Sequence, residues 1–180
     1  MLDLQPHSDD AAQPADSAKL PQAVASASRL LAQGVQCGNF LLAFNFDWAR
    51  QIVDDYELVP VPRAPAWVLG AVNINGLIVP VIDIDNYFSE STTPAQLQRG
   101  QRLLLGGVQA EDAEGALAIV FSQTPAQLEY DAQPLTDVTA LPVRLQDVCK
   151  GTASGEQGKL YIEVDPQRLM DALAAELSII

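Results

Sequence analysis

The chain has 180 residues, of which 48% are hydrophobic, and it carries a net charge of −13 with a sequence pI of about 4.2. This length fits one domain or two small lobes, and the apolar content is enough to build a core. An acidic surface repels phosphate groups, so we expect neither nucleic acid nor an anionic membrane surface as a partner.

Signals for membrane insertion, secretion and metal binding are missing from the sequence. No apolar run approaches the ~18 residues needed to span a bilayer. The N-terminus, Met1–Leu4, lacks a basic stretch followed by an apolar one, so we expect a cytoplasmic protein. Cys37, Cys149 and His7 lack metal-ligand spacing. We therefore expect two reduced thiols and no metal or other cofactor.

Residues 1–27 are rich in Ala, Asp, Gln, Pro and Ser and hold few side chains that could be buried. This composition predicts a disordered tail, because such a segment cannot offset the entropy lost on folding. The alternative is a short helix over residues 21–31, where several apolar residues have helical spacing.

A first pair of strands is predicted at residues 29–36 and 40–46, which are aliphatic and aromatic, with a turn at Cys37-Gly38-Asn39. Asp47 can cap a short helical turn over residues 48–51.

An extended run resumes at Ile52 and Val53 and is followed by a cluster of acids. The cluster predicts a solvated face, with a partner contact as the alternative. Its members are Asp54, Asp55 and Glu57.

The strongest local signal is the dipeptide Asn75-Gly76, which lies between two β-branched, apolar runs within residues 62–85. Both central residues of a type I′ turn need a positive φ, and Asn-Gly satisfies this requirement, so a β-hairpin is predicted here. Pro80 has no N–H to donate to a ladder and should lie at an edge or a bulge.

The rest of the chain alternates short strands with turns. Residues 89–100 indicate a loop, residues 106–115 an acidic hairpin tip, and the glycine-containing residues 150–159 a flexible turn. Strands are predicted at residues 102–105, 116–121, 127–130 and 160–164.

Two helices are predicted near the C-terminus. Residues 141–148 could form a short helix that presents Leu145 and Val148. Asp165 suits an N-cap before Pro166, and apolar residues then recur with helical spacing as far as Leu177. Many short strands with one convincing helix indicate a mainly β sandwich or barrel.

Catalytic constellations are sparse. Histidine is missing outside the tail, which removes most acid–base schemes, and no Gly-rich phosphate loop is present. Asp83 and Asp85, two residues apart on a predicted strand, could share a face and bind a cation, although a cap at the strand end explains them better. Cys149 beside Lys150 could have a lowered thiol pKa, but no base or redox partner accompanies it.

Residues 62–85 resemble the signature of the CheW-like domain, the bacterial chemotaxis adaptor, and the resemblance extends more weakly from about Arg29 to about Leu177. It implies two small five-stranded SH3-like barrels side by side within residues 28–178, with the hairpin in the first and the second at roughly residues 100–165.

The resemblance also implies partners. Family members couple the cytoplasmic tip of a chemoreceptor to the regulatory domain of a histidine kinase, with the receptor in the groove between the barrels. By position, the implied binding residues are Gln51, Ile52, Val53, Asn75 and Gly76. Ile52 and Val53 could instead be core residues, and Asn75 could serve only the turn.

Two positions depart from the family pattern. Asn75 stands where an arginine is common, and Gln51 where an acidic residue is frequent, which puts ordinary receptor coupling in question. Arg63 could substitute as the partner-binding cation. The hypothesis is a non-catalytic adaptor, in type IV pilus control for example; the alternatives are a CheW-like module with a different partner and a metal-dependent enzyme using Asp83 and Asp85.

Overall fold

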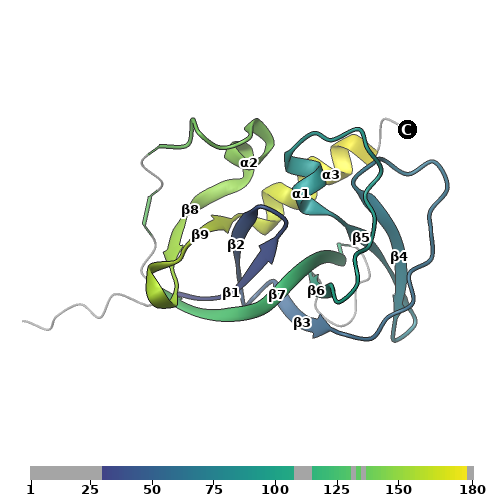
Figure 1. Ribbon diagram of the computed structural model, residues 1–180, viewed down its shortest axis with the longest axis horizontal. Helices are drawn as coiled ribbons and strands as arrows, with labels where there is room; N and C mark the ends of the chain where they lie inside the picture. The colour runs from purple at the N-terminus through teal and green to yellow at the C-terminus, as the bar shows by residue number, and fades with distance from the viewer. Residues whose placement is uncertain (1–29, 108–114, 131–132, 135–136, 178–180) are drawn as a thin grey trace, which may run out of the picture.

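The computed structural model describes residues 30–107, 115–130, 133–134 and 137–177 (Figure 1). The strands are β1 Leu30–Cys37, β2 Phe40–Asn45, β3 Ala49–Val53, β4 Val68–Ile74, β5 Leu77–Ile82, β6 Arg102–Gly106, β7 Leu117–Tyr130, β8 Cys149–Ser154 and β9 Leu160–Val164. The helices are α1 Ile84–Phe88, α2 Val143–Val148 and α3 Pro166–Leu177, with a 3₁₀ turn at Glu156–Gly158. The predicted disordered tail, its helical alternative as far as residue 29, and most of the acidic hairpin tip lie outside the described residues.

Two groups of five strands share β7, which runs across both lobes in Figure 1. The first lobe has the strand order β3-β6-β7-β5-β4, and the second has the order β7-β1-β2-β9-β8. Among the described residues, neither path closes on itself by strand pairing. The prediction of a mainly β fold with two small five-stranded lobes is confirmed.

The division of the chain between the lobes differs from the expected one. Strand β6 and the first part of β7 pair with β3 and β5, so they belong with the signature hairpin rather than to the second lobe. The second lobe instead begins with β1 and β2, which pair with the later part of β7 and with β9. The strand pairing therefore does not support the expected second lobe over roughly residues 100–165.

The hairpin at Asn75-Gly76 is confirmed. Ile74 pairs with Leu77 across the two-residue loop, in which φ is 52° at Asn75 and 90° at Gly76, as a type I′ turn requires. The carbonyl Oδ1 of Asn73 also accepts a hydrogen bond from the Gly76 N–H at 2.8 Å. Local turn chemistry is therefore enough to place β4 and β5.

Pro80 lies at a position in β5 where the sheet does not need a backbone N–H donor. It lies opposite Ala71, whose N–H and carbonyl are both bonded to Val59, at 2.8 Å each, rather than to β5. On its other side, β5 begins to pair with β7 only at Val81. The missing N–H of proline thus leaves no ladder bond unmade.

Strand β7 replaces two separately predicted strands, residues 116–121 and 127–130. The segment between them, which reads as polar, continues the strand through an irregularity where Gln123 has a φ of 63° and the register with β1 shifts. The guanidinium of Arg102 donates to the Gln123 carbonyl and lies 5.0 Å from the centre of the Phe121 ring. These tertiary contacts hold a bend that sequence alone assigns to a loop.

Two other local expectations are wrong. Residues 48–51 are not a helical turn, because Ala49–Val53 pairs with β6 as β3 and the Trp48 N–H donates to Asn45 rather than being capped by Asp47. Residues 150–159 are not simply a flexible turn, because Cys149–Ser154 pairs with β9 as β8. The backbone of Gln133 approaches Gly151 so closely that no side chain would fit, which explains glycine inside a strand.

Three apolar clusters form the core. One lies within the first lobe around Val72, Val79 and Leu103, and one within the second lobe around Leu128 and Tyr161. The largest, here called the central cluster, joins the lobes and the helices; its members include Phe44, Trp67, Ile82, Tyr87, Phe88, Phe121, Leu145, Leu169 and Leu173. The lobes are therefore packed against one another through buried side chains.

The two predicted helices are present as α2 and α3. Leu145 and Val148 of α2 are buried, as expected. Asp165 Oδ1 accepts hydrogen bonds from the N–H groups of Gln167 and Arg168 at 3.0 and 3.2 Å, which confirms it as the cap of α3. Within the described residues, no helix has the length and apolarity needed to cross a membrane.

Candidate protein-binding surface

The two carboxylates after β5 serve different structural roles. Asp83 is the N-cap of α1, and its Oδ1 accepts from the Asn86 N–H at 3.1 Å. Asp85 lies in the first turn of α1, not on a strand, and its Oδ1 accepts from the Asn39 N–H at 3.1 Å. The Asp85 carboxylate therefore joins the β1–β2 turn to α1. The capping interpretation is supported over a shared cation site, because each carboxylate already holds a backbone N–H.

Burial sets the ionisation of this region. It raises the pKa of Asp83, with the charge of Asp85 adding to the effect and the hydrogen bond from Asn86 opposing it. Beyond this pair, the described residues contain no group of three or more His, Cys, Asp or Glu side chains that could hold a metal ion.

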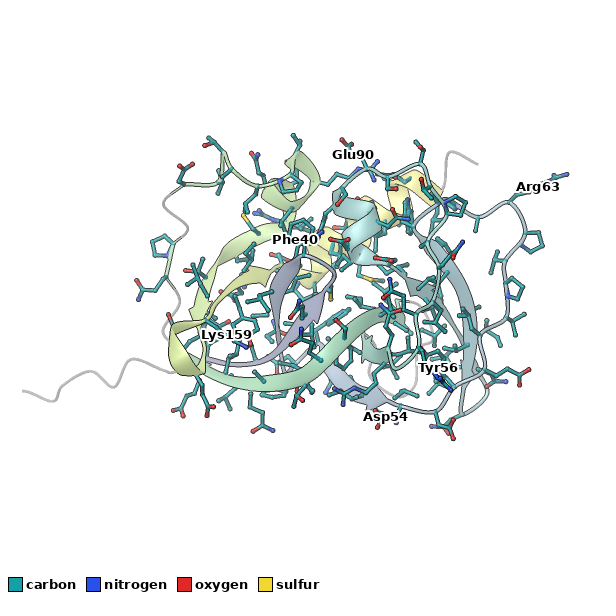
Figure 2. The ribbon with its side chains drawn as sticks, viewed as in Figure 1. Phe40, Asp54, Tyr56, Arg63, Glu90 and Lys159 are labelled. Carbon is teal, nitrogen blue, oxygen red and sulfur yellow. The ribbon has the colours of Figure 1, made fainter. Side chains whose placement is uncertain are left out.

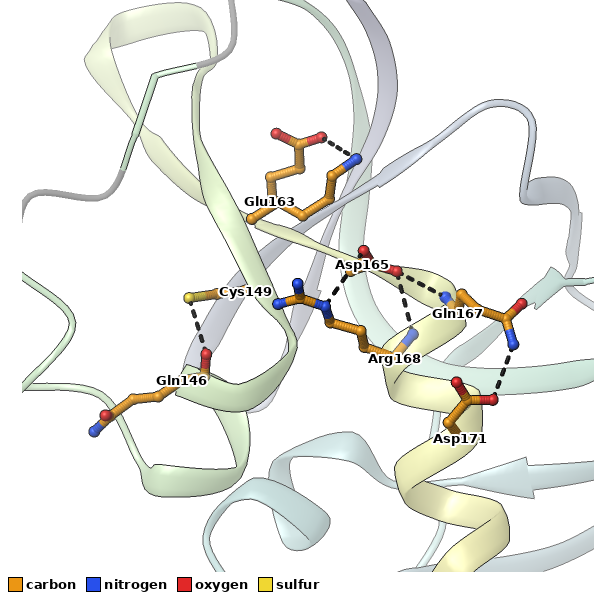
Figure 3. A network of polar contacts seen from close by, with 8 residues as sticks. Gln146, Cys149, Glu163, Asp165, Gln167, Arg168 and Asp171 are labelled. Carbon is orange, nitrogen blue, oxygen red and sulfur yellow. Dashed lines mark hydrogen bonds and ion pairs between the residues drawn. The ribbon is translucent and has the colours of Figure 1, made fainter.

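Neither cysteine has a lowered thiol pKa. Cys37 is buried, and burial together with the charges of Asp83 and Asp85 raises its pKa far above the ordinary value. Burial also raises the pKa of Cys149, whose Sγ donates to the Gln146 carbonyl at 3.4 Å (Figure 3). A thiol with a raised pKa is a poor nucleophile at neutral pH, so Cys149 lacks the properties of a reactive cysteine.

Strand β3 carries three of the sequence-predicted partner residues, and the structure separates them by exposure. Gln51 is exposed, Ile52 is half-buried against the central cluster, and Val53 is 9% exposed in the core of the first lobe. Gln51 is therefore the member of this trio that a partner can reach without rearrangement. Because β3 pairs only with β6 among the described strands, its other edge is also available there.

Asn75 and Gly76 form an exposed hairpin tip. An added Cβ at Gly76 would meet no atom within 4 Å, so this tip is limited by its backbone conformation and not by neighbouring side chains. Both residues remain candidates for partner contact.

Arg63 lies elsewhere on the molecule. Figure 2 shows it projecting at the upper right, whereas Asp54, the residue after Val53, lies at the bottom of the same view. The Ala64 N–H donates to the Val61 carbonyl at 3.4 Å, so Arg63 is the third residue of a tight turn after Pro62. A cation that substitutes for the missing charges of the receptor groove would have to lie close to Gln51. The structure does not bring Arg63 and Gln51 together.

Polar contacts surround the start of α3 (Figure 3), and the Asp165 N–H donates to the Val148 carbonyl at the end of α2 at 2.7 Å. Asp165 caps the helix and lies 3.8 Å from the Arg168 Nε, and the Gln167 Nε2 donates to Asp171 at 2.9 Å. On the preceding strand, the buried Glu163 carboxylate lies 3.9 Å from the Lys150 Nζ. Further along α3, Leu173 joins the central cluster.

An apolar groove at the far end of α3 was not predicted from the sequence. It has a volume of about 420 Å³ and lies between residues 61–68 and the helix residues Leu173 and Leu177. Val61, which lines the groove, is 46% exposed, and Val59, two residues earlier, is 58% exposed. One feature of the sequence could have indicated the groove, namely the alternation of Val and Pro at residues 59–62. Proline favours an extended backbone there, and the segment has no apolar face that packs into the core.

The comparison with protein families decides the identity of the domain. The family model described as the CheW-like domain matches residues 32–174, which is most of the chain. The chain belongs to the CheW-like domain family. No curated protein sequence matches it.

Among solved structures, this CheW-like domain is similar to the crystal structure of the scaffolding protein TtCheW from Thermoanaerobacter tengcongensis. The TM-score is 0.60 at 16% sequence identity, and the match covers 76% of this chain and 88% of the other. At that identity the likeness supports the fold, and it agrees with the two-lobed arrangement described above.

The two departures from the family pattern lie on the exposed surface of this CheW-like domain. Gln51 on β3 and Asn75 at the hairpin tip are both solvent-exposed and neutral. The fold therefore does not depend on a charged side chain at either position. Both side chains are therefore accessible on the first lobe and carry no charge.

Proposed function

We propose that this CheW-like domain is a cytoplasmic, non-catalytic adaptor that couples a chemoreceptor cytoplasmic tip to the regulatory domain of a histidine kinase. The observation that carries the proposal is the family match over residues 32–174, on a chain that folds into the corresponding two lobes. The structural roles of Asp83 and Asp85, as cap and turn anchor, support the non-catalytic part.

Gln51 and the Asn75-Gly76 tip are the receptor-side residues in this proposal. Both positions are exposed, and both lack the charge that the family commonly has. Polar contacts that depend on such charges are therefore weakened, and a typical receptor tip should bind poorly. A specialised signalling system, such as one that controls type IV pili, is the setting we propose by analogy.

A substitution at the hairpin tip tests the receptor side. Arginine offers a forked, permanently charged donor that asparagine lacks, so Asn75→Arg should strengthen binding to a typical chemoreceptor tip. Since φ is 52° at this position and asparagine tolerates it better, the variant should lose about 1 kcal/mol of stability. Isothermal titration and denaturant unfolding measure the two effects.

The kinase regulatory domain serves as the control in the same titrations, because Asn75 is assigned to the receptor side and its substitution should leave kinase binding unchanged. Gln51→Glu provides a second restoration of a family charge and should also favour the receptor. If the parent binds neither protein and both variants gain nothing for the receptor, the adaptor proposal in this form is wrong.

A CheW-like module with a different protein partner is the second candidate function. The neutral residues at Gln51 and Asn75 favour it, because they remove charges from the surface implied for receptor binding. Under this alternative, the parent chain would bind the kinase domain but no receptor tip, and Asn75→Arg would not change that result.

A further inference from the structure

The apolar groove beside α3 lies at the opposite end of the hairpin from the Asn75-Gly76 tip. Its floor includes Val68 and Ile82, which pair with each other at the far end of β4 and β5. Strands rise about 3.3 Å per residue, so roughly 20 Å of hairpin separates the groove from the tip. The groove is therefore a separate surface from the one proposed for the receptor.

The segment that forms one wall of the groove is held at both ends. Val59 exchanges two backbone hydrogen bonds with Ala71, and the Ala66 carbonyl accepts from the Ala95 N–H at 2.7 Å and the Asn86 Nδ2 at 2.9 Å. Trp67 is 5% exposed and packs edge-to-face on Tyr87 at 5.3 Å. The wall is thus preformed, which reduces the entropy that a partner must overcome on binding.

Exposed apolar side chains continue the groove onto the surface. Val59 and Val61 lie on the approach to the wall, and Leu177 on the helix side is 45% exposed. Pro80, which is exposed, also lines the groove. Exposed apolar side chains beside an apolar pocket are a common feature of protein-docking sites.

Arg63 is the one charged side chain among the described residues that line the groove. It is exposed, and no ion pair is recorded for it in the described part of the chain. Its φ is 61°, at the third position of a turn that begins Val61-Pro62, where glycine or asparagine is normal. Arginine is sterically disfavoured at this φ, so the turn itself gives no reason for an arginine here.

We infer that this groove docks a segment of a partner protein that carries a large apolar side chain next to an aspartate or glutamate. The apolar side chain fills the pocket against Val68, Ile82 and Leu173, and the carboxylate pairs with the Arg63 guanidinium. Arg63 supplies a local attraction for an acidic segment on a chain whose net charge of −13 repels such a segment at longer range.

Selection from a displayed library of random twelve-residue peptides on the full chain tests the inference. Enriched peptides should contain Phe, Trp, Leu or Met within three positions of Asp or Glu. Their affinity should fall at least tenfold in Arg63→Glu and in Val61→Asp. Lys159→Glu changes the net charge equally on the opposite side of the molecule and should leave affinity within about twofold (Figure 2).

Arg63→Gly separates a binding role from a structural one. Glycine relieves the positive φ, so the denaturation midpoint should stay the same or rise, while peptide affinity falls as in Arg63→Glu. A lower midpoint together with lost binding would show that Arg63 supports the fold, and would overturn the inference.

Other results would also contradict it. These are a failure to enrich peptides, enrichment without acidic residues, and equal binding by the parent and Arg63→Glu. Tighter peptide binding after the double change Ile179→Asp and Ile180→Asp would identify the chain's own C-terminal segment as the occupant instead. None of these results depends on receptor or kinase binding, so this inference and the proposed function fail separately.

Discussion

At the residue scale, Asp83 shows how one carboxylate ends a strand and begins a helix. It follows Ile82 at the end of β5 and caps α1 through the Asn86 N–H. It is also partly buried, and burial raises its pKa above the ordinary value of 3.8. The cap requires an oxygen at this position, whereas burial disfavours a charge on it.

Asp83→Asn should therefore stabilise the protein relative to the parent as pH rises. The folded state holds the Asp83 proton more tightly than the unfolded chain, so the parent loses stability as pH rises from 3.8 through the folded pKa. Asparagine keeps the capping oxygen without the charge. The free energy of unfolding, measured in denaturant, should favour Asp83→Asn more at about pH 7 than at about pH 3.

Asp83→Ala is the matched control, because it removes the oxygen as well as the charge. We expect Asp83→Ala to be about 0.5–2 kcal/mol less stable than Asp83→Asn at either pH, because both variants lack the charge and only asparagine keeps the capping oxygen. Equal effects of the two substitutions at neutral pH would mean that the capping bond contributes nothing to stability.

Gly76→Val should destabilise the hairpin. A β-branched side chain is badly placed at a φ of 90°, and the strain should cost about 1–3 kcal/mol. Asn75→Gly, which also permits a positive φ, should change the denaturation midpoint much less. An unchanged midpoint for Gly76→Val would show that the turn relaxes to another conformation in solution.

Local chemistry explains which residue predictions succeed. The Asn75-Gly76 turn and the Asp165 cap depend on neighbours within a few positions, so they can be predicted from sequence. Asp47 and Gly151 cannot be interpreted in this way. The segment after Asp47 is a strand because β6 pairs with it, and Gly151 is required by the distant Gln133 backbone.

At the element scale, α3 connects the lobes through its buried face. The Asp165 N–H donates to the Val148 carbonyl at the end of α2, and Leu169 and Leu173 reach the central cluster. The apolar stripe that predicted this helix also predicted its core-facing side. Sequence periodicity gave no information on what the last turn covers, and that turn forms the wall of the apolar groove.

Leu173→Ala should be the more damaging of two leucine truncations on this helix. Leu173 is 3% exposed, so removing its side chain leaves a cavity and should cost about 2–5 kcal/mol. Leu177 is 45% exposed, and Leu177→Ala should cost about 1 kcal/mol or less. Thermal and denaturant unfolding report the difference, and similar losses would mean that α3 does not pack on the core as described.

Strand β7 shows why strand continuity was missed. Its middle, Ser122–Pro125, is polar and contains a positive φ at Gln123, so a local reading breaks the strand there. The pairing of Gln36 with Ser122, and of Gly34 with Ala126, carries the strand from one lobe to the other. Such pairing joins residues about ninety positions apart in the sequence and is set by the tertiary fold.

At the scale of the whole molecule, the three core clusters explain the two-lobed architecture. The signature hairpin identified the family and hence the two lobes, but the assignment of β6 to the first lobe needed the strand pairing. The site residues also came from the family pattern. The structure adds their exposure, leaving Gln51 and the hairpin tip accessible and Val53 in the core. Arg63 belongs to a different face, which only three-dimensional placement could reveal.

The central claim is that one small, non-catalytic domain bridges a receptor and a kinase. Sedimentation velocity of the full chain with a chemoreceptor tip and a kinase regulatory domain tests it directly, using Asn75→Arg to strengthen the receptor contact. We expect a species in the three-protein mixture that sediments faster than any two-protein mixture, since the receptor and kinase should occupy different surfaces. If receptor and kinase displace each other from the chain, or if neither binds, the adaptor account is contradicted.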